Sequence, residues 1–175
     1  VLVTDEQGTV RDIVRVEDAG EGVEVYKGIL SPGFVNCHCH LELSHLRGRI
    51  PLHSGMVPFL LAVIQQRQQQ PEQVREAIAV AEQEMLHNGI VAVGDICNTA
   101  ATISQKQQRQ LLYHNFIEVT GFIPAIAAKR FEEACRLYDQ FTDLSAEQPP
   151  PVSIVPHAPY SVSSGLFQLI ASFAG

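Results

Sequence analysis

Short apolar runs alternate with longer helix-like segments along most of this chain, and this alternation limits most strongly how it can fold. Four apolar runs predict buried strands, at 33–40, 90–93, 116–119 and 152–155. The segments between and after them favour helices, at 59–69, 72–88, 103–112, 125–141 and 164–173. Continuous apolar strands that alternate with helices are typical of a parallel sheet covered by helices.

The helix-like segment after Pro71 has the clearest periodicity. Its apolar residues recur at i, i+3, i+4, i+7 and i+11, which places them on one helical face: Val74, Ala77, Ile78, Ala81 and Met85. Gly89 follows where a C-terminal cap belongs, and Ser163 or Ser164 is suited to cap the last helix. These signals predict helix boundaries as well as helices.

Four strand–helix units make half of a (β/α)8 barrel, which typically needs about 250 residues. We therefore predict that residues 29–175 are the N-terminal half of such a barrel. Residues 1–28 contain short β-like runs, at 1–3, 10–16 and 23–26, separated by glycines, and predict part of a small β-sheet domain. The chain begins with Val1 and shows no closing element, so we expect it to be a fragment of a longer protein.

Composition and charge exclude several kinds of partner. The formal net charge is −7 and no basic run offsets it, which argues against nucleic-acid binding through phosphate neutralisation. The longest apolar stretches fall far short of the roughly 20 residues that span a bilayer, so no membrane partner is expected. The four cysteines show no disulfide framework, and reduced thiols in a cytoplasmic protein are the simplest interpretation.

Two histidines on the first predicted strand are the strongest chemical signal. Residues i and i+2 of a strand point to the same face, so His38 and His40 should both face the barrel interior near the carboxyl end of the strand, where barrel active sites lie. Paired imidazoles suit zinc or iron. The same alternation predicts that Val35, Cys37 and Cys39 pack outward beneath the helices.

Two other interpretations of the pair remain open from the residues alone. His38 and His40 could be ordinary polar residues at a strand end. Cys37 and Cys39 could join them in a structural zinc knuckle, although knuckle ligands usually come from turns with C-x2-C or H-x3-H spacing.

The surrounding motif resembles a known family. P-G-F-V-N-C-H-C-H-L-E-L-S-H-L-R-G, from Pro32 to Gly48, is similar to the strand-1 motif of the amidohydrolase superfamily, P-G-x-[IV]-[ND]-x-H-x-H-L, with the L-x-R-G tail of its deaminase and chlorohydrolase branch. Three later segments resemble strands 2, 3 and 4 of that branch, at 89–95, 116–122 and 155–163, the last as H-[AS]-P-Y-[ST]. The resemblance runs from Ile29 to Ser163.

The resemblance implies roles for individual residues. His38 and His40 match the first two ligands of one divalent metal, zinc or iron, and His157 matches a histidine that contacts substrate. The family's third histidine ligand, proton-shuttling glutamate (H-x-x-E) and metal-bound aspartate have no match here and are expected beyond residue 175. No catalytic residue is therefore assigned within the chain, and the fragment alone is expected to be inactive.

Two carboxylates are further substrate-site candidates. Glu42 continues the inward alternation two residues beyond His40 and could hydrogen-bond a substrate amine or amide; the alternative is a solvated loop carboxylate. Asp95 ends the second strand and could face substrate or orient a ligand, or cap the next helix. Glu118 interrupts an apolar strand, so either it faces the barrel interior or the strand prediction is wrong. His53, His87 and His114 are expected on the surface or in loops.

The implied function of the intact protein is metal-dependent hydrolysis of a small molecule. A metal-bound hydroxide, formed because the metal lowers the pKa of water toward about 7, would deaminate a purine nucleoside or related aromatic amine. The H-x-H-x-E-x-S stretch resembles aminodeoxyfutalosine deaminases in particular. Alternatives are a chlorohydrolase, a cyclic-amide hydrolase, or a non-catalytic half-barrel whose strand edges pair in a homo-oligomer.

Overall fold

The computed structural model describes residues 1–143 and 150–173, in two compact units, Val1–Pro32 and Gly33–Gly175. In the first unit, β1 (Leu2–Thr4) pairs antiparallel with β2 (Val10–Ile13), and a 3-10 turn, η1, covers Val16–Asp18. The third β-like run, residues 23–26, is not in a strand. Its β-branched and aromatic composition alone does not create a strand, because a strand also needs a hydrogen-bonding partner.

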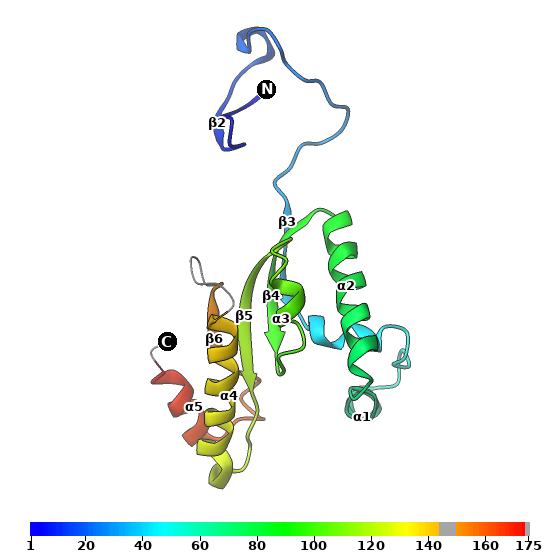
Figure 1. The fold of residues 1–175 in the computed structure, drawn as a ribbon, viewed down its shortest axis with the longest axis vertical. Coiled ribbons are helices and arrows are strands. Elements are labelled where there is room, and N and C mark those ends of the chain that lie inside the picture. Colours follow the sequence, from blue (N-terminus) through cyan, green and yellow to red (C-terminus); the bar gives the residue numbers. More distant parts are fainter. Residues whose placement is uncertain (144–149, 174–175) are drawn as a thin grey trace. The chain divides into compact units, whose positions relative to one another are not determined.

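The second unit is built on a parallel sheet (Figure 1). Its strands are β3 (Phe34–Cys39), β4 (Ile90–Cys97), β5 (Leu112–Val119) and β6 (Val152–Pro156), which lie side by side in chain order. All three neighbouring pairs are parallel. Parallel strands in sequential order, each followed by helical structure, are the first part of a TIM-barrel arrangement, and the predicted fold class is confirmed.

Helices connect the strands. They are η2 (Leu41–Leu46), α1 (Met56–Gln66), α2 (Pro71–His87), α3 (Ile103–Lys106), η3 (Pro124–Ile126), α4 (Ala127–Thr142) and α5 (Ser164–Ala171). Helix α2 packs on β4, whereas α4 packs on β5 and β6 and is flanked by α5, as Figure 1 shows. No helix in the described ranges is both long and apolar enough to cross a membrane.

One face of the sheet is covered and the other is open. In β5 the alternate residues Tyr113, Ile117 and Val119 are buried, whereas Leu112 is 74% exposed. Ile78 of α2 is 1% exposed and packs in the same apolar core as Val93 and Tyr113, with Val74, Ala81 and Met85 around it. The predicted apolar face of this helix is therefore confirmed.

The helix ends agree with the sequence signals. Gly89 has a φ of +76°, the left-handed conformation expected just after a helix, and the backbone N–H of Asn88 caps α2. The Ser163 hydroxyl accepts a hydrogen bond from the backbone N–H of Leu166 at the start of α5. Both predicted capping positions are confirmed, with Ser163 rather than Ser164 as the N-cap.

The prediction of a helix over 103–112 is largely wrong. Helix α3 ends at Lys106, and Arg109 adopts a φ of +54°, which an α-helix does not allow. Leu112 already belongs to β5, where it pairs with Ala92 of β4. His114 is also in β5 and contacts the Ser153 hydroxyl at 2.9 Å, so it is not the surface or loop histidine expected. Pairing in the sheet overrides the weak helical preference of this Gln-rich stretch.

An irregular register in β3 changes which side chains face the helices. Asn36 lies opposite Val93 and Cys39 opposite Asp95, so three steps along β3 match two along β4. Such a bulge adds a residue and reverses the alternation. Cys39 packs against the core as predicted, but Val35 and Cys37 are exposed, and the prediction that they pack beneath the helices is wrong.

Candidate metal and substrate site

His38 and His40 stand next to each other at the carboxyl end of β3. Their ring centroids are 5.2 Å apart and the rings meet edge to face at 64°. Cys39, between them, packs into the core on the helix side, so by alternation both imidazoles belong to the opposite, open face of the sheet. The structure thus brings together the two residues predicted as metal ligands.

The environment of His40 fits a metal ligand. Its Nδ1 atom is buried and has no hydrogen-bond partner among the described residues. A buried polar atom without a partner is costly, and coordination to a metal would relieve an imidazole of this kind. The described residues contain no group of three or more His, Cys, Asp and Glu that could hold a metal. His38 and His40 by themselves would be two of the ligands that a metal site needs.

Glu42 lies in η2, and its carboxylate is bound by the loop that follows β4. Its Oε2 accepts hydrogen bonds from the backbone N–H groups of Asn98 (3.2 Å) and Thr99 (2.9 Å) and from the Thr99 hydroxyl (2.7 Å). Its Oε1 lies 3.4 Å from the guanidinium of Arg67. The side chain is buried, which rules out the solvated carboxylate that was the alternative, while contact with substrate stays a prediction.

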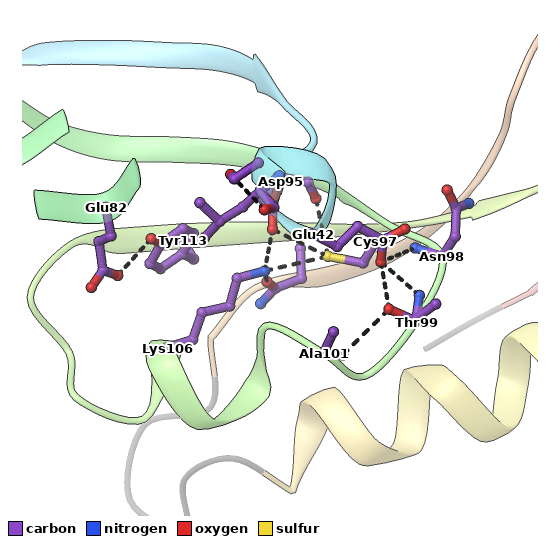
Figure 2. A network of polar contacts seen from close by, with 12 residues as sticks. Glu42, Glu82, Asp95, Cys97, Asn98, Thr99, Ala101, Lys106 and Tyr113 are labelled. Atoms are coloured by element: carbon purple, nitrogen blue, oxygen red, sulfur yellow. Dashed lines mark hydrogen bonds and ion pairs between the residues drawn. The ribbon is translucent and has the colours of Figure 1, made fainter. Parts of the chain in front are cut away.

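Asp95 is fully buried on the helix side of the sheet. Figure 2 shows its polar contacts. Its Oδ1 accepts a hydrogen bond from the backbone N–H of Leu41 at 2.8 Å, and its Oδ2 pairs with Lys106 Nζ at 2.5 Å. Lys106 also donates to Asn115 Oδ1 at 2.7 Å. Asp95 thus binds the backbone immediately after His40; that it orients a ligand or contacts substrate stays a prediction.

Burial also determines the state of the nearby thiols. Burial, with the charge of Asp95 as a smaller cause, raises the pKa of Cys39 to about 12. Burial raises the pKa of Cys97 to about 12, although the charge of Lys106 acts in the opposite direction. Both thiols are therefore protonated at neutral pH and act as small packing groups in this environment.

His157 is exposed, immediately after the carboxyl end of β6. Its Nδ1 contacts the Ser161 hydroxyl at 2.8 Å, and its ring meets that of Tyr160 edge to face. Because the strands are parallel, His157 follows β6 at the same edge of the sheet at which His38 and His40 lie. Ser161 holds one ring nitrogen, which orients the imidazole for a contact through the other.

Glu118 lies near the same edge on β5. Its neighbours Ile117 and Val119 are buried beneath the helices, so Glu118 belongs to the open face, as predicted. Asn98 Nδ2 donates to Glu118 Oε2 at 3.2 Å. The sequence does not predict a role for Asn98, Thr99 and Lys106, because nothing in their spacing distinguishes them from ordinary loop and surface residues.

Residues 29–171 match the amidohydrolase family, over a region that contains both histidines of β3 and His157. The chain belongs to the amidohydrolase family. The match covers most of the second unit and agrees with the resemblance recognised from the P-G-F-V-N-C-H-C-H segment.

Among curated amidohydrolase relatives, the chain is similar to the 5-methylthioadenosine/S-adenosylhomocysteine deaminase of Natronomonas pharaonis. The two are 29% identical over 183 residues, an alignment that includes 99% of this chain and 40% of the relative. The chain thus spans about two fifths of the length of that relative.

Solved amidohydrolase structures share the fold. The aminofutalosine deaminase of Helicobacter pylori, in complex with methylthio-coformycin, matches with a TM-score of 0.69 at 22% identity, over 79% of this chain and 33% of that one. A zinc-bound adenosine deaminase from Xanthomonas campestris matches with a TM-score of 0.59 at 25% identity, over 80% and 33%. The zinc complex of atrazine chlorohydrolase from Arthrobacter aurescens matches with a TM-score of 0.63 at 19% identity, over 80% and 37%.

Proposed function

We propose that the protein to which this chain belongs is a metal-dependent hydrolase that deaminates a purine nucleoside or a related aromatic amine. The observation that carries the proposal is the pair of adjacent imidazoles, His38 and His40, at the carboxyl end of the first parallel strand of an amidohydrolase chain. Relatives named as deaminases of adenosine, aminofutalosine and 5-methylthioadenosine support the reaction type.

His38 and His40 would hold one divalent ion, zinc or iron, together with ligands from outside this chain. When bound, the ion would lower the pKa of a water molecule toward about 7 and supply the nucleophile at neutral pH. The strand fixes the two rings relative to each other, which reduces the reorganisation needed for binding. Coordination would also give a partner to the buried Nδ1 atom of His40, which has no hydrogen bond to the described residues.

His157 would bind the substrate from the end of β6. The Ser161 hydroxyl holds its Nδ1 atom, so the ring presents Nε2 in a fixed direction as a hydrogen-bond partner for the substrate. Glu42 and Glu118 lie near the same edge of the sheet, each tied to Asn98, and are candidates to line the site. The partner is thus a small molecule. A cytoplasmic location and a possible homo-oligomeric state belong to the same proposal.

The first prediction concerns the histidine pair in the full-length protein. Replacing either residue, as His38→Ala or His40→Ala, removes a metal ligand. We expect bound metal and ammonia release from purine nucleosides to fall together by at least about 100-fold, since even outer partners of a metal ligand are worth about 10–100-fold. Metal analysis and an ammonia assay measure the two quantities on the same samples.

His87→Ala is the matched control, because this histidine is exposed in the last turn of α2, and it should leave both quantities unchanged. Undiminished ammonia release by His38→Ala and His40→Ala would refute the proposed function. Chloride release from a chlorinated heteroaromatic, without ammonia release from any purine nucleoside, would replace deamination by dehalogenation.

A further inference from the structure

A buried acid–base pair, Asp95 and Lys106, lies on the helix side of the sheet, away from the face that carries the histidines. The two side chains are 0% and 3% exposed, and their charged atoms are 2.5 Å apart. Taking two charges out of water is expensive unless further partners satisfy them. Lys106 finds these partners in Asn115 Oδ1 (2.7 Å) and Cys97 Sγ (3.3 Å).

Aromatic rings complete the enclosure of the ammonium group. Its nitrogen lies 4.9 Å from the centre of the Tyr113 ring and 5.0 Å from that of Phe141. Aromatic faces attract cations at such distances. Lys106 is therefore contacted from several sides; Figure 2 shows its contacts with Asp95 and Cys97.

The second oxygen of Asp95 binds the backbone just after β3, at the first residue of η2. The backbone N–H of Leu41 donates to Asp95 Oδ1 at 2.8 Å, and this bond is buried. A peptide unit is planar, so fixing the Leu41 N–H fixes the plane that joins Leu41 to His40. The carbonyl of the same peptide, on His40, accepts the N–H of Leu43 at 2.9 Å. Both ends of the peptide that leaves His40 are held.

Glu42, the residue after Leu41, is held from the end of β4. Glu42 accepts hydrogen bonds from Asn98 and Thr99, which directly follow β4. Leu41 and Glu42 are thus tied to the end of β4 at successive positions, once by the backbone and once by a side chain. Because His40 is where β3 passes into η2, the direction of its side chain depends on these ties.

We infer that Asp95, fixed by Lys106, is a positioning residue that sets the orientation of His40 through the Leu41 amide. The inference rests on the proposed metal role of His38 and His40. Asp95 acts from the opposite face of the sheet and need not contact metal or substrate. A rigid support of this kind is what a metal ligand requires to stay within the tolerance of its site.

The test uses two double variants of the full-length protein that differ mainly in one hydrogen-bond acceptor. In both, Lys106→Met removes the ammonium, so neither leaves a buried lysine without its carboxylate. Asp95→Asn keeps an oxygen for the Leu41 amide, whereas Asp95→Ala does not. We expect D95A/K106M to bind zinc about tenfold more weakly in a chelator competition, and D95N/K106M to remain near the wild type.

A second readout needs no metal. In the metal-free protein, hydrogen exchange at the Leu41 amide should be slow in the wild type and in D95N/K106M, and at least about tenfold faster in D95A/K106M. If the alanine variant does not fold, the exchange rate of the Leu41 amide in the wild type still tests the inference. A Leu41 amide that exchanges as fast as an exposed loop amide would overturn the inference.

Glu82→Ala is the matched control. Glu82 is fully buried, and it accepts hydrogen bonds from Tyr113 and Gln105, neither of which is on β3. This variant should lower the free energy of unfolding and leave zinc affinity unchanged. If D95A/K106M behaves in the same way, Asp95 is merely structural and the inference fails. If His38→Ala keeps wild-type zinc affinity, it is the proposed function that fails.

Discussion

At the scale of single residues, the sheet separates two kinds of chemistry. His38 and His40 occupy the open face, where ligands and substrate can approach, while Asp95, Lys106 and Glu82 are buried on the helix side. Asp95 forms an ion pair with Lys106, and Glu82 accepts hydrogen bonds from Tyr113 and Gln105. A buried charge is costly unless it has such partners. These buried groups bind one another and the backbone next to His40.

Replacing Tyr113 tests how much one of these buried hydrogen bonds contributes to the free energy of unfolding. Its hydroxyl donates to Glu82 at 2.7 Å, and burial together with this bond raises the pKa of Tyr113. Tyr113→Phe leaves a buried carboxylate with one donor fewer, so we expect the free energy of unfolding to fall by about 1–3 kcal/mol in urea titrations. Tyr26→Phe, at an exposed tyrosine, should change it by less than about 0.5 kcal/mol. Equal effects would contradict the account.

The Cys97 thiol gives a prediction about pH. Burial raises its pKa to about 12, so the native thiol stays protonated at pH 9. An unfolded cysteine has a pKa of about 8.5 and is largely ionised at that pH. Iodoacetamide should leave Cys97 unmodified at pH 9 in the native protein and alkylate it in urea, as mass spectrometry would detect. Unfolding then releases this proton, so Cys97 makes stability fall between about pH 8.5 and 12. Rapid native alkylation would contradict the placement.

At the scale of elements, the close approach of β3 and β4 depends on Gly94. A Cβ atom at this position would lie 2.8 Å from the Cys37 carbonyl oxygen and 3.1 Å from the Phe116 ring. Cys37 is next to His38, so a shift of the Cys37 carbonyl that relieves the contact moves β3 at this point. The glycine thus links sheet packing to the geometry of the histidine pair.

We therefore expect Gly94→Ala to destabilise the protein by about 1–3 kcal/mol and to weaken metal binding. Thermal unfolding and zinc titration measure the two effects. Gly165→Ala is the control, because nothing lies within 4 Å of the added atom in α5 and alanine favours a helix. It should leave metal binding unchanged. A stable Gly94→Ala protein with normal zinc affinity would show that β3 and β4 adjust without cost.

Sequence patterns predicted the elements best where one periodicity dominates. The apolar face of α2 and the caps at Gly89 and Ser163 were correct because they depend on local spacing. The outward packing of Val35 and Cys37 was wrong because the bulge in β3 arises from pairing with β4, a partner far along the chain. Likewise, no local pattern shows that Lys106 meets Asp95, since that contact depends on how α3 returns to the sheet.

At the scale of the whole molecule, one face of the parallel sheet has exposed apolar residues. Leu112 of β5 is 74% exposed and Phe34 of β3 is 61% exposed. The chain spans 40% of the curated deaminase relative and a third of the solved deaminases. Because a single barrel site draws residues from the ends of several strands, metal binding and turnover must be measured on the full-length protein.

We expect His38 and His40 to bind the metal on which hydrolysis depends. Anomalous diffraction from crystals of the active full-length protein, recorded at the absorption edges of zinc and iron, tests this expectation directly. We expect one strong peak within bonding distance of an imidazole nitrogen of His38 and an imidazole nitrogen of His40. A peak bound by other residues, with both of these histidines outside the ligand set, would contradict this expectation.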